Sequence, residues 1–416
     1  MSARAKVHVI GAGLAGLSAA VRLAERGLSV EVSEAAAQAG GRCRSYFDKE
    51  LGLTIDNGNH LVLSGNHAVR DYLATIGASD RLAGPDRAVF DWADIRTGER
   101  WRLRPNEGPL AWWVLSQARR VPGTRAADYL QIAKLLPAQP AARRVDQAMA
   151  CRGPLWDRLM QPFLVAALNT EAEASSAELA GAVLRETLAK GGAHYRPRIA
   201  EPTLAAAFVD PAVAWLTAHG GSVRLGQRLK KLDVEGGRVV GLDFGDETTP
   251  VAAGEAVVLA VPPWVAQQLL PGLSAPDDFR SIVNGHFRIE PPAGALPMVG
   301  VIGGTAEWVF CFPGRISTTT SAADRIVDWD RERLAHALWA DVAALHGLGP
   351  DLPPWQIVKE KRATFAATPE QEAKRPPART ELSNLVLAGD WTRTGLPATI
   401  EGAVRSGVEA ARLTLS

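Results

Sequence analysis

Three glycines near the start of the chain limit its fold more than any other feature of the sequence. Gly11, Gly13 and Gly16 form a G-x-G-x-x-G turn after the short apolar run at residues 7–10. Apolar residues with helical spacing follow, and the alternating segment LSVEVSE predicts a second strand. This order predicts a parallel βαβ unit that binds a dinucleotide, with Gly13 beside the pyrophosphate and the helix N-terminus facing it. A tight turn without a ligand is the alternative.

An acidic residue and a second glycine pair follow this unit. Glu34 ends the second predicted strand, where a carboxylate accepts hydrogen bonds from ribose hydroxyls and repels a 2′-phosphate. Gly40, Gly41 and Arg42 come within eight residues of Glu34, whereas folds that bind NAD normally continue into another helix. We therefore expect a diphosphate contacted from both sides, with Arg42 donating two hydrogen bonds to its oxygens.

With these motifs the sequence resembles the flavin-containing amine oxidase and phytoene desaturase superfamily. The segment IDNGNHLVLSG (residues 55–65) stands where the family has its D/E-x-G motif, and LVLAGDWTRTGLPATIEGAVRSGVEAA matches the C-terminal flavin motif. The resemblance implies an α/β fold with a Rossmann-like FAD-binding domain and an inserted α+β substrate domain. It also implies non-covalent FAD, because Cys43 and Cys311 match no flavin attachment site.

The motifs and the resemblance together assign residues to the cofactor. In the C-terminal motif, Asp390 ends a predicted strand and is placed to bind ribityl hydroxyls, and the helix from about Ile400 offers free N–H groups to the flavin ring. By resemblance alone, Leu229 lies near the adenine through its backbone. The full cofactor set is Gly11, Gly13, Ala15, Gly16, Glu34, Gly41, Arg42, Asn57, Gly58, Asn59, Leu229, Gly389, Asp390, Thr399, Ile400 and Ala403.

Sequence patterns divide the 416 residues into two discontinuous domains. Residues 1–65, 197–275 and 376–416 carry the α/β pattern and form the expected FAD-binding domain. Residues 66–196 are rich in Trp and have the apolar spacing of helices that are interrupted by prolines. Residues 276–375 predict an antiparallel sheet with one helix. We expect these two stretches to form the substrate domain.

Three shorter predictions concern single elements. One helix is expected over PTLAAAFVDPAVAWLTAHGG and one strand over SVRLGQRLKKLDVE. The segment PLAWWVLSQARR (residues 109–120) predicts a helix that either lies in a membrane surface or packs in the core with a basic end. No apolar stretch is long enough to cross a bilayer, and no export signal is present. These features predict a cytoplasmic protein, with peripheral binding to the inner membrane left open.

A narrower likeness is to the bacterial hydroxysqualene dehydroxylases of hopanoid biosynthesis. It rests on GGRCRSYFD, IDNGNHLVLSG, LWDRLMQPFLVAALNTEAEASSA and LPATIEGAV, and it covers nearly the whole chain. The chain departs from the expected pattern after Gly65, where Asn66 and His67 replace an aromatic residue, and at Asn59, near which Gln is expected. The likeness implies loss of the allylic hydroxyl of a C30 isoprenoid, with reduced flavin as the electron source.

That reaction needs a proton donor for the departing water and a site that excludes solvent. His60 is the first candidate donor, because its segment is expected beside the flavin and an ordinary imidazole pKa is about 6.5. Asp56 is the second, either as an acid with a raised pKa or as the partner that orients His60; it equally suits a turn. Asn169 either donates to the departing hydroxyl or caps the helix that follows it.

Composition excludes several other classes of protein. Lys and Arg number 46 against 45 Asp and Glu, without a basic block, so nucleic acid is not an expected partner. Three scattered cysteines and eight histidines without ligand spacing predict no disulfide framework and no metal. No second G-x-G-x-x-G is present for a nicotinamide, so the electron donor is not identified.

Three alternatives to a dehydroxylase remain. A phytoene desaturase would share the flavin motifs and move hydride from substrate to oxidised FAD. An amine oxidase is less favoured, because its polar substrate needs aromatic or polar recognition and the chain has only four Tyr. A lipid carrier with a structural flavin is the alternative outside enzymes.

Overall fold

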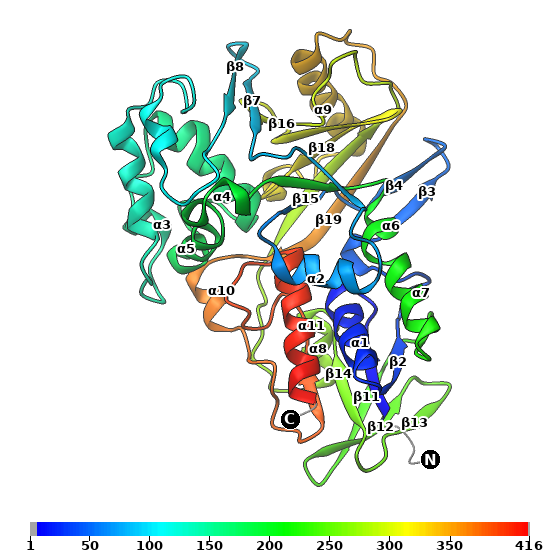
Figure 1. Cartoon of the computed structure of the whole chain (residues 1–416). Helices are drawn as coiled ribbons and strands as arrows, with labels where there is room; N and C mark the ends of the chain where they lie inside the picture. The colour runs from blue at the N-terminus through cyan, green and yellow to red at the C-terminus, as the bar shows by residue number, and fades with distance from the viewer. Residues whose placement is uncertain (1–5, 415–416) are drawn as a thin grey trace.

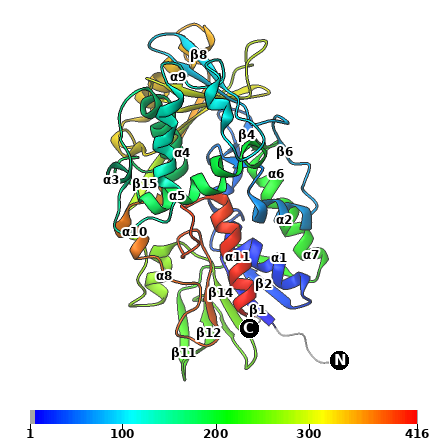
Figure 2. The same ribbon diagram turned by 60° about the vertical axis from the view of Figure 1, so that its left-hand side comes forward.

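The computed structural model describes residues 6–414 and shows two bodies that share one chain (Figure 1). The lower body holds a parallel sheet with helices α1 and α11, and the upper body holds a large sheet with helix α9 on one side. Irregular helical segments lie against the other side of the large sheet, as the turned view in Figure 2 also shows. The α/β class with a Rossmann-like parallel sheet is confirmed.

The parallel sheet has the strand order β10-β2-β1-β14-β20, and every neighbouring pair is parallel. Its strands come from four separated stretches of the chain. They are β1 (Lys6–Ile10), β2 (Ser29–Ser33), β10 (Ser222–Arg224), β14 (Ala256–Leu259) and β20 (Leu385–Leu387). Because parallel strands expose their carboxyl ends at one edge, the glycine turn and Asp390 meet there.

Two helices that are distant in sequence pack together against this sheet. Helix α1 (Leu14–Glu25) touches α11 (Ile400–Thr414) so closely that a Cβ on Gly407 would lie 2.3 Å from the carbonyl oxygen of Ala15. The other elements of the lower body are α2 (His67–Thr75), α6 (Leu204–Phe208), α7 (Asp210–Ala218), α8 (Pro263–Leu269), β11 (Lys231–Glu235), β12 (Arg238–Asp243) and β13 (Thr248–Pro250).

The large sheet has seven strands in the order β19-β15-β18-β17-β16-β7-β8. All its pairs are antiparallel except β16 with β7. The strands are β7 (Phe90–Asp94), β8 (Glu99–Leu103), β15 (Phe279–Phe287), β16 (Met298–Ile302), β17 (Trp308–Phe312), β18 (Arg315–Thr320) and β19 (Trp355–Phe365). Helix α9 (Arg331–His346) covers one face, where it buries Leu334 and Leu338.

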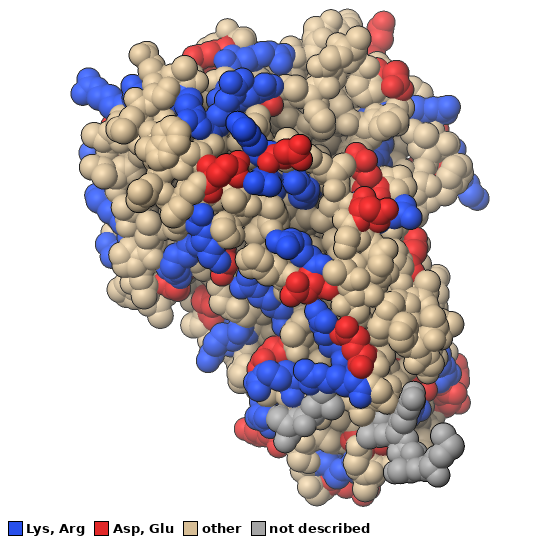
Figure 3. Space-filling model, in the orientation of Figure 1, with Lys and Arg blue, Asp and Glu red and all other residues tan. Residues whose placement is uncertain are grey.

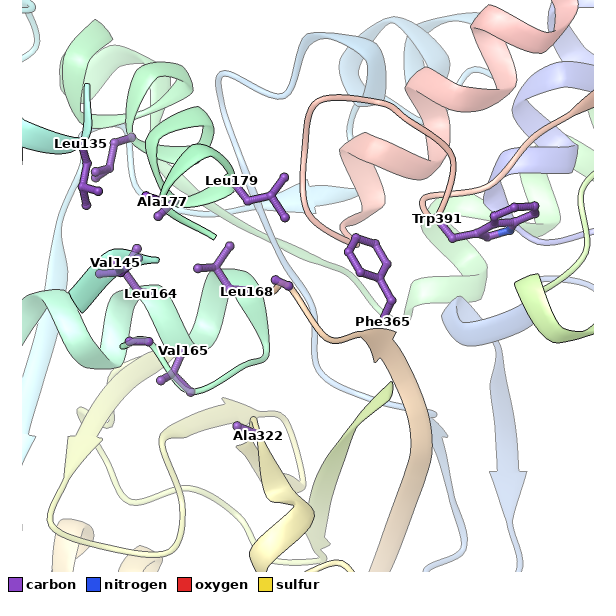
Figure 4. Close-up of a cluster of buried hydrophobic side chains, with 14 of the residues drawn as sticks. Leu135, Val145, Leu164, Val165, Leu168, Ala177, Leu179, Ala322, Phe365 and Trp391 are labelled. Carbon is purple, nitrogen blue, oxygen red and sulfur yellow. The ribbon is translucent and has the colours of Figure 1, made fainter. Parts of the chain in front are cut away.

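Buried leucines, valines and aromatic residues join the helical segments to the other face of the large sheet (Figure 4). The segments there are α3 (Val145–Ala148), α4 (Gln161–Leu168), α5 (Ala177–Glu186), the 3-10 turns Trp112–Leu115 and Ala126–Leu135, and the π-helical turn Trp156–Met160. The remaining elements are β3 (Ser45–Asp48), β4 (Leu53–Asp56), β5 (Leu61–Leu63), β6 (Leu82–Ala83), β9 (Pro197–Ala200) and α10 (Pro369–Ala373).

The structure corrects four sequence predictions. Residues 66–196 are not helical throughout, because the hairpin β7–β8 joins the large sheet through β16. The helix expected over 109–120 is only the short 3-10 turn Trp112–Leu115. The helix expected over 202–221 is divided into α6 and α7 beside Pro211, and the strand expected over 222–235 is two strands of different sheets. Strand β15 was not predicted.

Candidate active site

The first glycine turn leaves no room for side chains at two of its three glycines. Gly11 has φ +106°, and a Cβ there would lie 2.4 Å from the carbonyl oxygen of Ala260. A Cβ on Gly16 would lie 1.9 Å from the carbonyl oxygen of Gly11. Gly13 differs, because nothing lies within 4 Å of its Cβ position. The open side of the turn is therefore at Gly13, where the pyrophosphate was predicted.

The second glycine pair lies directly beside the first turn. Gly13 and Gly40 form a parallel bridge, and the Gly40 amide donates to the Ala12 carbonyl oxygen at 2.8 Å. Gly41 has φ +56°, and its Cβ position is 3.4 Å from the Cα of Gly13. Two glycine segments thus form one narrow cradle of backbone, which fits a diphosphate contacted from both sides.

The acidic residue is anchored at the same edge of the sheet. Glu34 accepts hydrogen bonds from the Ala12 amide at 2.7 Å and the Ala36 amide at 2.8 Å. Its own carbonyl oxygen accepts from the Gln227 amide, which brings the connection between β10 and β11 to this edge. The buried Leu229 belongs to that connection. The arrangement leaves carboxylate lone pairs for ribose hydroxyls and brings Leu229 to the predicted adenine side.

Arg42 and Asp390 form a close ion pair at the edge of the cradle. One Arg42 nitrogen, Nη2, lies 2.8 and 2.7 Å from the two carboxylate oxygens of Asp390, and Nη1 donates to the Ala363 carbonyl oxygen at 2.5 Å. Burial lowers the pKa of Arg42, but the Asp390 carboxylate outweighs this and the pKa is raised. Although Arg42 lies deep in the molecule, 42% of its side-chain surface is open. The Arg42 side chain is therefore partly open, whereas the Asp390 side chain is only 7% exposed.

The C-terminal motif places a helix N-terminus at the same edge. Thr399 caps α11, with its hydroxyl accepting from the Gly402 amide at 3.0 Å and its carbonyl oxygen accepting from the Ala403 amide at 2.9 Å. The helix then begins at Ile400. A Cβ on Gly389 would lie 2.3 Å from the Trp391 indole nitrogen. The start of α11 supplies the partial positive charge expected beside the flavin.

Residues 57–59 connect the lower body to the large sheet. The Asn57 side-chain amide donates to Glu360 at 3.2 Å, and the Asn59 amide donates to the Thr319 hydroxyl at 3.1 Å. A Cβ on Gly58 would lie 3.1 Å from the side-chain nitrogen of Asn284. Glu360, Thr319 and Asn284 were not predicted as site residues. The alternation along β18 and β19 was visible in the sequence, but not which face meets the cofactor.

His60 does not have the pKa on which its selection rested. Burial lowers the pKa of His60 to about 4, and the positive charge of Arg42 adds to this lowering. The expectation of an ordinary imidazole pKa is therefore wrong, because burial and Arg42 both disfavour the protonated ring. Its role as proton donor is a separate matter and stays a prediction.

Asp56 holds the start of a helix. Its Oδ1 accepts from the Ser45 hydroxyl at 2.6 Å and from the Leu204 amide, the first residue of α6, at 2.9 Å. Burial raises the pKa of Asp56, against the effect of these two donors. Within residues 6–414 no hydrogen bond joins Asp56 to His60, so the structure gives no support to an orienting role. The raised pKa is in the predicted direction.

Asn169 ends helix α4 in the left-handed conformation, with φ +48°. Its side chain donates to the Thr364 hydroxyl at 2.9 Å and accepts from the Ala322 amide at 2.7 Å. The prediction that Asn169 caps the following helix is wrong, because Ser176 caps α5. Asn169 instead ties α4 to the large sheet.

A row of side chains crosses the large sheet from Asn59 outward. In the strand register, Thr319 lies opposite Trp308, and Trp308 lies opposite Gly300. Gly300 in turn lies opposite Trp92, and Trp92 lies opposite Trp101. The rings of Trp92 and Trp308 are 5.0 Å apart, and those of Trp92 and Trp101 are stacked at 6.3 Å. Directly opposed residues share a face, so the sheet becomes aromatic and apolar away from Asn59. We call Trp308, Trp92 and Trp101 the tryptophan row.

These residues fit a dinucleotide whose second half is a flavin. The glycine cradle suits the diphosphate, Glu34 the ribose, and the N-terminus of α11 the ring oxygens. The open surface of Arg42 borders the place between them.

Comparisons with known proteins agree with this geometry. The family described as flavin containing amine oxidoreductase matches residues 14–415. The chain is 54% identical over 411 residues to a hydroxysqualene dehydroxylase of Rhodopseudomonas palustris, covering 99% of this chain and 98% of that protein. It is 53% identical over 410 residues to the hydroxysqualene dehydroxylase of Sinorhizobium fredii, covering 99% and 98%.

More distant matches share the fold. A 15-cis-phytoene desaturase of an Oncidium hybrid cultivar is 24% identical over 481 residues, covering 97% of this chain and 76% of that protein. Among solved structures, cyclohexylamine oxidase from Brevibacterium oxydans superposes with a TM-score of 0.72 at 15% identity, covering 98% of both chains. At that identity the likeness shows the fold alone.

Proposed function

The chain belongs to the family of flavin-containing amine oxidoreductases, and from this premise we propose that it removes the allylic hydroxyl of hydroxysqualene to give squalene. The protein is a flavin-dependent oxidoreductase. We further propose that the flavin is FAD, bound without a covalent bond, and that the reaction serves squalene and hopanoid synthesis.

One observation carries the proposed substrate. Over nearly the whole chain, identity to a hydroxysqualene dehydroxylase is 54%, against 24% to a phytoene desaturase. The tryptophan row does not itself offer a surface to the substrate, because Trp92, Trp101 and Trp308 are buried in the core. A desaturase acting on a carotenoid precursor is the second candidate, since it would share the flavin motifs and a phytoene desaturase is among the relatives.

The proposed FAD contacts are those of the cradle and the two flanking motifs. Reduced FAD would supply the hydride of the reaction. Non-covalent binding is supported by Cys43, the cysteine that follows Arg42: burial raises the pKa of its thiol to about 12, so it is not a ready nucleophile. We also propose that residues 1–65, 197–275 and 376–416 form the FAD-binding domain, and residues 66–196 and 276–375 the substrate domain, although α2 (His67–Thr75) packs against α11 in the lower body.

In the proposed reaction the substrate takes up one proton and one hydride and loses water, and it needs no other reactant. The carbon–oxygen bond breaks as a proton reaches the departing oxygen, water leaves, and hydride reaches the allylic carbon. We propose that His60 or Asp56 handles the proton, and that the apolar residues of the substrate domain exclude water so that hydride is captured first. Asn169 orders the end of α4 beside this region. The electrons come from a donor outside the chain.

The decisive experiment is anaerobic turnover with photoreduced enzyme. Hydroxysqualene should be converted to squalene with one flavin oxidised per product. If squalene is not formed, and oxidised enzyme instead dehydrogenates phytoene, the desaturase proposal is correct. If neither substrate changes the flavin spectrum, the protein is a carrier.

A variant tests the proton donor. His60→Ala should keep the flavin spectrum and turn over at least about tenfold more slowly, since general acid catalysis typically contributes more than that. Asp56→Asn is the matched variant for the second candidate. Turnover of His60→Ala at the parental rate would remove His60 from the mechanism.

Peripheral membrane binding is proposed for the surface around residues 110–130. Leu110, Trp112, Leu115 and Leu130 are exposed by 57–77%, and the Arg119 guanidinium lies 4.9 Å from the Trp112 ring centre. Basic side chains predominate over the upper left part of the face in Figure 3. Apolar residues beside cations suit an anionic lipid surface. Within residues 6–414 no helix is long and apolar enough to cross a membrane.

Vesicle flotation tests the surface. The protein should bind vesicles with anionic lipid better than neutral ones, and Trp112→Ser with Leu115→Ser should reduce binding severalfold. Phe47→Ser, which removes another exposed aromatic residue, is the control. Equal binding by all three proteins would contradict the proposal.

A further inference from the structure

Arg375 is a fully buried arginine whose role the proposed reaction does not explain. Its side chain has no exposed surface, and it follows helix α10 where the chain returns from the large sheet to the lower body. Long charged side chains are almost never buried completely unless their charge and hydrogen bonds are satisfied. The partners of Arg375 therefore show what the residue organises.

Most of these partners belong to one short turn of the C-terminal motif. The Arg375 guanidinium donates to the carbonyl oxygens of Asp390 and Thr392, each at 3.0 Å, and to the Thr394 hydroxyl at 2.8 Å. A second bond from Nη2 reaches the Thr392 carbonyl oxygen. We call residues 389–394 the flavin turn. A planar group with five donors fixes several carbonyl oxygens at once, which a lysine cannot do.

The remaining donors of Arg375 join the flavin turn to α10. Nη1 lies 2.6 Å from the Glu372 carboxylate, and the guanidinium lies 4.9 Å from the centre of the Phe365 ring. Figure 4 shows the Phe365 ring at the end of β19, directed toward the C-terminal segment. The charge is thus neutralised inside the protein. Breaking such a buried pair from one side leaves an uncompensated charge.

The segment before Arg375 is itself fastened to the upper body. The Ala367 amide donates to the Thr170 hydroxyl at 2.8 Å, and the Gln371 side chain accepts from the Asp277 amide at 2.9 Å. Arg375 therefore stands between these anchors and the flavin turn. On the far side of the turn, Asp390 holds Arg42.

We infer that Arg375 is a positioning residue for the cofactor: it fixes the flavin turn so that Asp390 faces Arg42 and the flavin. The inference rests on the FAD binding of the proposed function and not on its substrate. Arg375 touches neither reactant. It acts by holding backbone carbonyl oxygens that would otherwise be free to turn.

The test measures FAD binding to apoprotein by quenching of flavin fluorescence, together with the melting temperature of the apoprotein. Arg375→Met should raise the FAD dissociation constant about tenfold or more, because several carbonyl oxygens lose a buried donor. Arg375→Lys should fall between this variant and the parent, since an ammonium restores the charge and only part of the contacts. The visible flavin spectrum of each variant reports whether the turn still shapes the ring environment.

Arg280→Met is the matched control. Arg280 is a largely buried arginine that pairs with Asp278 and lies near the same anchors, but no hydrogen bond joins it to the flavin turn within residues 6–414. The Arg280→Met variant should have a lower melting temperature than the parent, with an FAD dissociation constant within about twofold of the parent's.

Two results would overturn the inference. One is an unchanged FAD dissociation constant in Arg375→Met. The other is an equal loss of FAD binding in Arg280→Met at an equal loss of melting temperature, which would make Arg375 a stabilising residue only. If Arg375→Met does not fold, Arg375→Lys decides by the same measurement. Because no substrate is used, failure to turn over hydroxysqualene leaves this test unaffected.

Discussion

The two largest sheets of the molecule differ in the way nearby glycines are used. At the turn between β1 of the parallel sheet and α1, a side chain on Gly11 or Gly16 would meet backbone oxygens, at 2.4 and 1.9 Å. In the large sheet, a Cβ on Gly300 would lie 2.5 Å from the Trp92 ring. Backbone atoms cannot move without breaking the strand pairing, whereas a ring can adopt another rotamer. The glycine cradle is therefore fixed by backbone geometry, and the tryptophan row by side-chain packing that can change.

Gly16→Ala is expected to have the largest effect. The new methyl group has no room against the Gly11 carbonyl oxygen, so the turn between β1 and α1 cannot form. We expect no soluble folded protein, as judged by size-exclusion chromatography and circular dichroism. Gly349→Ala, at a site with open space, should behave as the parent. Folded Gly16→Ala protein with bound flavin would show that the cradle backbone is not rigid.

Gly13→Ala separates cofactor binding from folding. Its methyl group would enter open space in the cradle rather than meet the protein. The apoprotein should melt within about 2 °C of the parent, because this corresponds to less than about 1 kcal/mol. FAD binding should weaken roughly a hundredfold, about 3 kcal/mol, if the diphosphate lies against Gly13. Titration of apoprotein with FAD measures this; unchanged affinity would place the diphosphate elsewhere.

Gly300→Ala examines the tryptophan row. The methyl group should displace the Trp92 ring and destabilise the protein by about 1–3 kcal/mol, as overpacked cores do. Because the clash is with a side chain, Trp92→Leu in the same protein should cost less than the sum of both changes. Thermal melting of the four proteins gives this coupling. Additive losses would show that the ring is not the obstacle.

Glu307→Gln should leave the fold and the site unchanged and alter only how stability depends on pH. Burial raises the pKa of Glu307 from 4.5 to about 7. Between these values the folded protein keeps a proton that the unfolded chain releases, so stability falls as pH rises through this interval. Gln cannot titrate. The variant should gain about 2 kcal/mol relative to the parent between pH 5 and pH 8. Parallel melting curves at both pH values would contradict the raised pKa.

The difference between local backbone geometry and side-chain packing also explains which parts of the site could be predicted from the sequence. The cradle, Glu34 and the start of α11 follow from local rules of turns and caps, and the structure brings them to one edge. Strand β15 was missed because its buried side chains include Asn284 and His286, which resemble a loop in sequence. Its polar residues bond to other segments of the chain: His286 lies 2.9 Å from the Ser317 hydroxyl, and Asn284 accepts from the Thr319 hydroxyl at 2.8 Å.

The rest of the site depends on contacts between segments that lie far apart in the sequence. The hairpin β7–β8 reaches the large sheet through β16, about two hundred residues later, and no local pattern predicts that partner. Arg42 and Asp390 were each assigned to the cofactor, but not to one another. Glu360, Thr319 and Arg375 contact the site from segments whose facing side is decided only by tertiary packing.

The parallel sheet has a consequence for synthesis in the cell. Strands β1 and β20 belong to the same five-stranded sheet but lie 375 or more residues apart. At ribosomal speeds of roughly 5–20 residues per second, β1 waits on the order of half a minute before β20 and α11 exist. During that interval α1 lacks the helix that covers it, and Arg42 lacks its partner Asp390. In a nascent chain of this design, the face of α1 that packs on α11 therefore stays uncovered until translation has passed Ile400, where α11 begins.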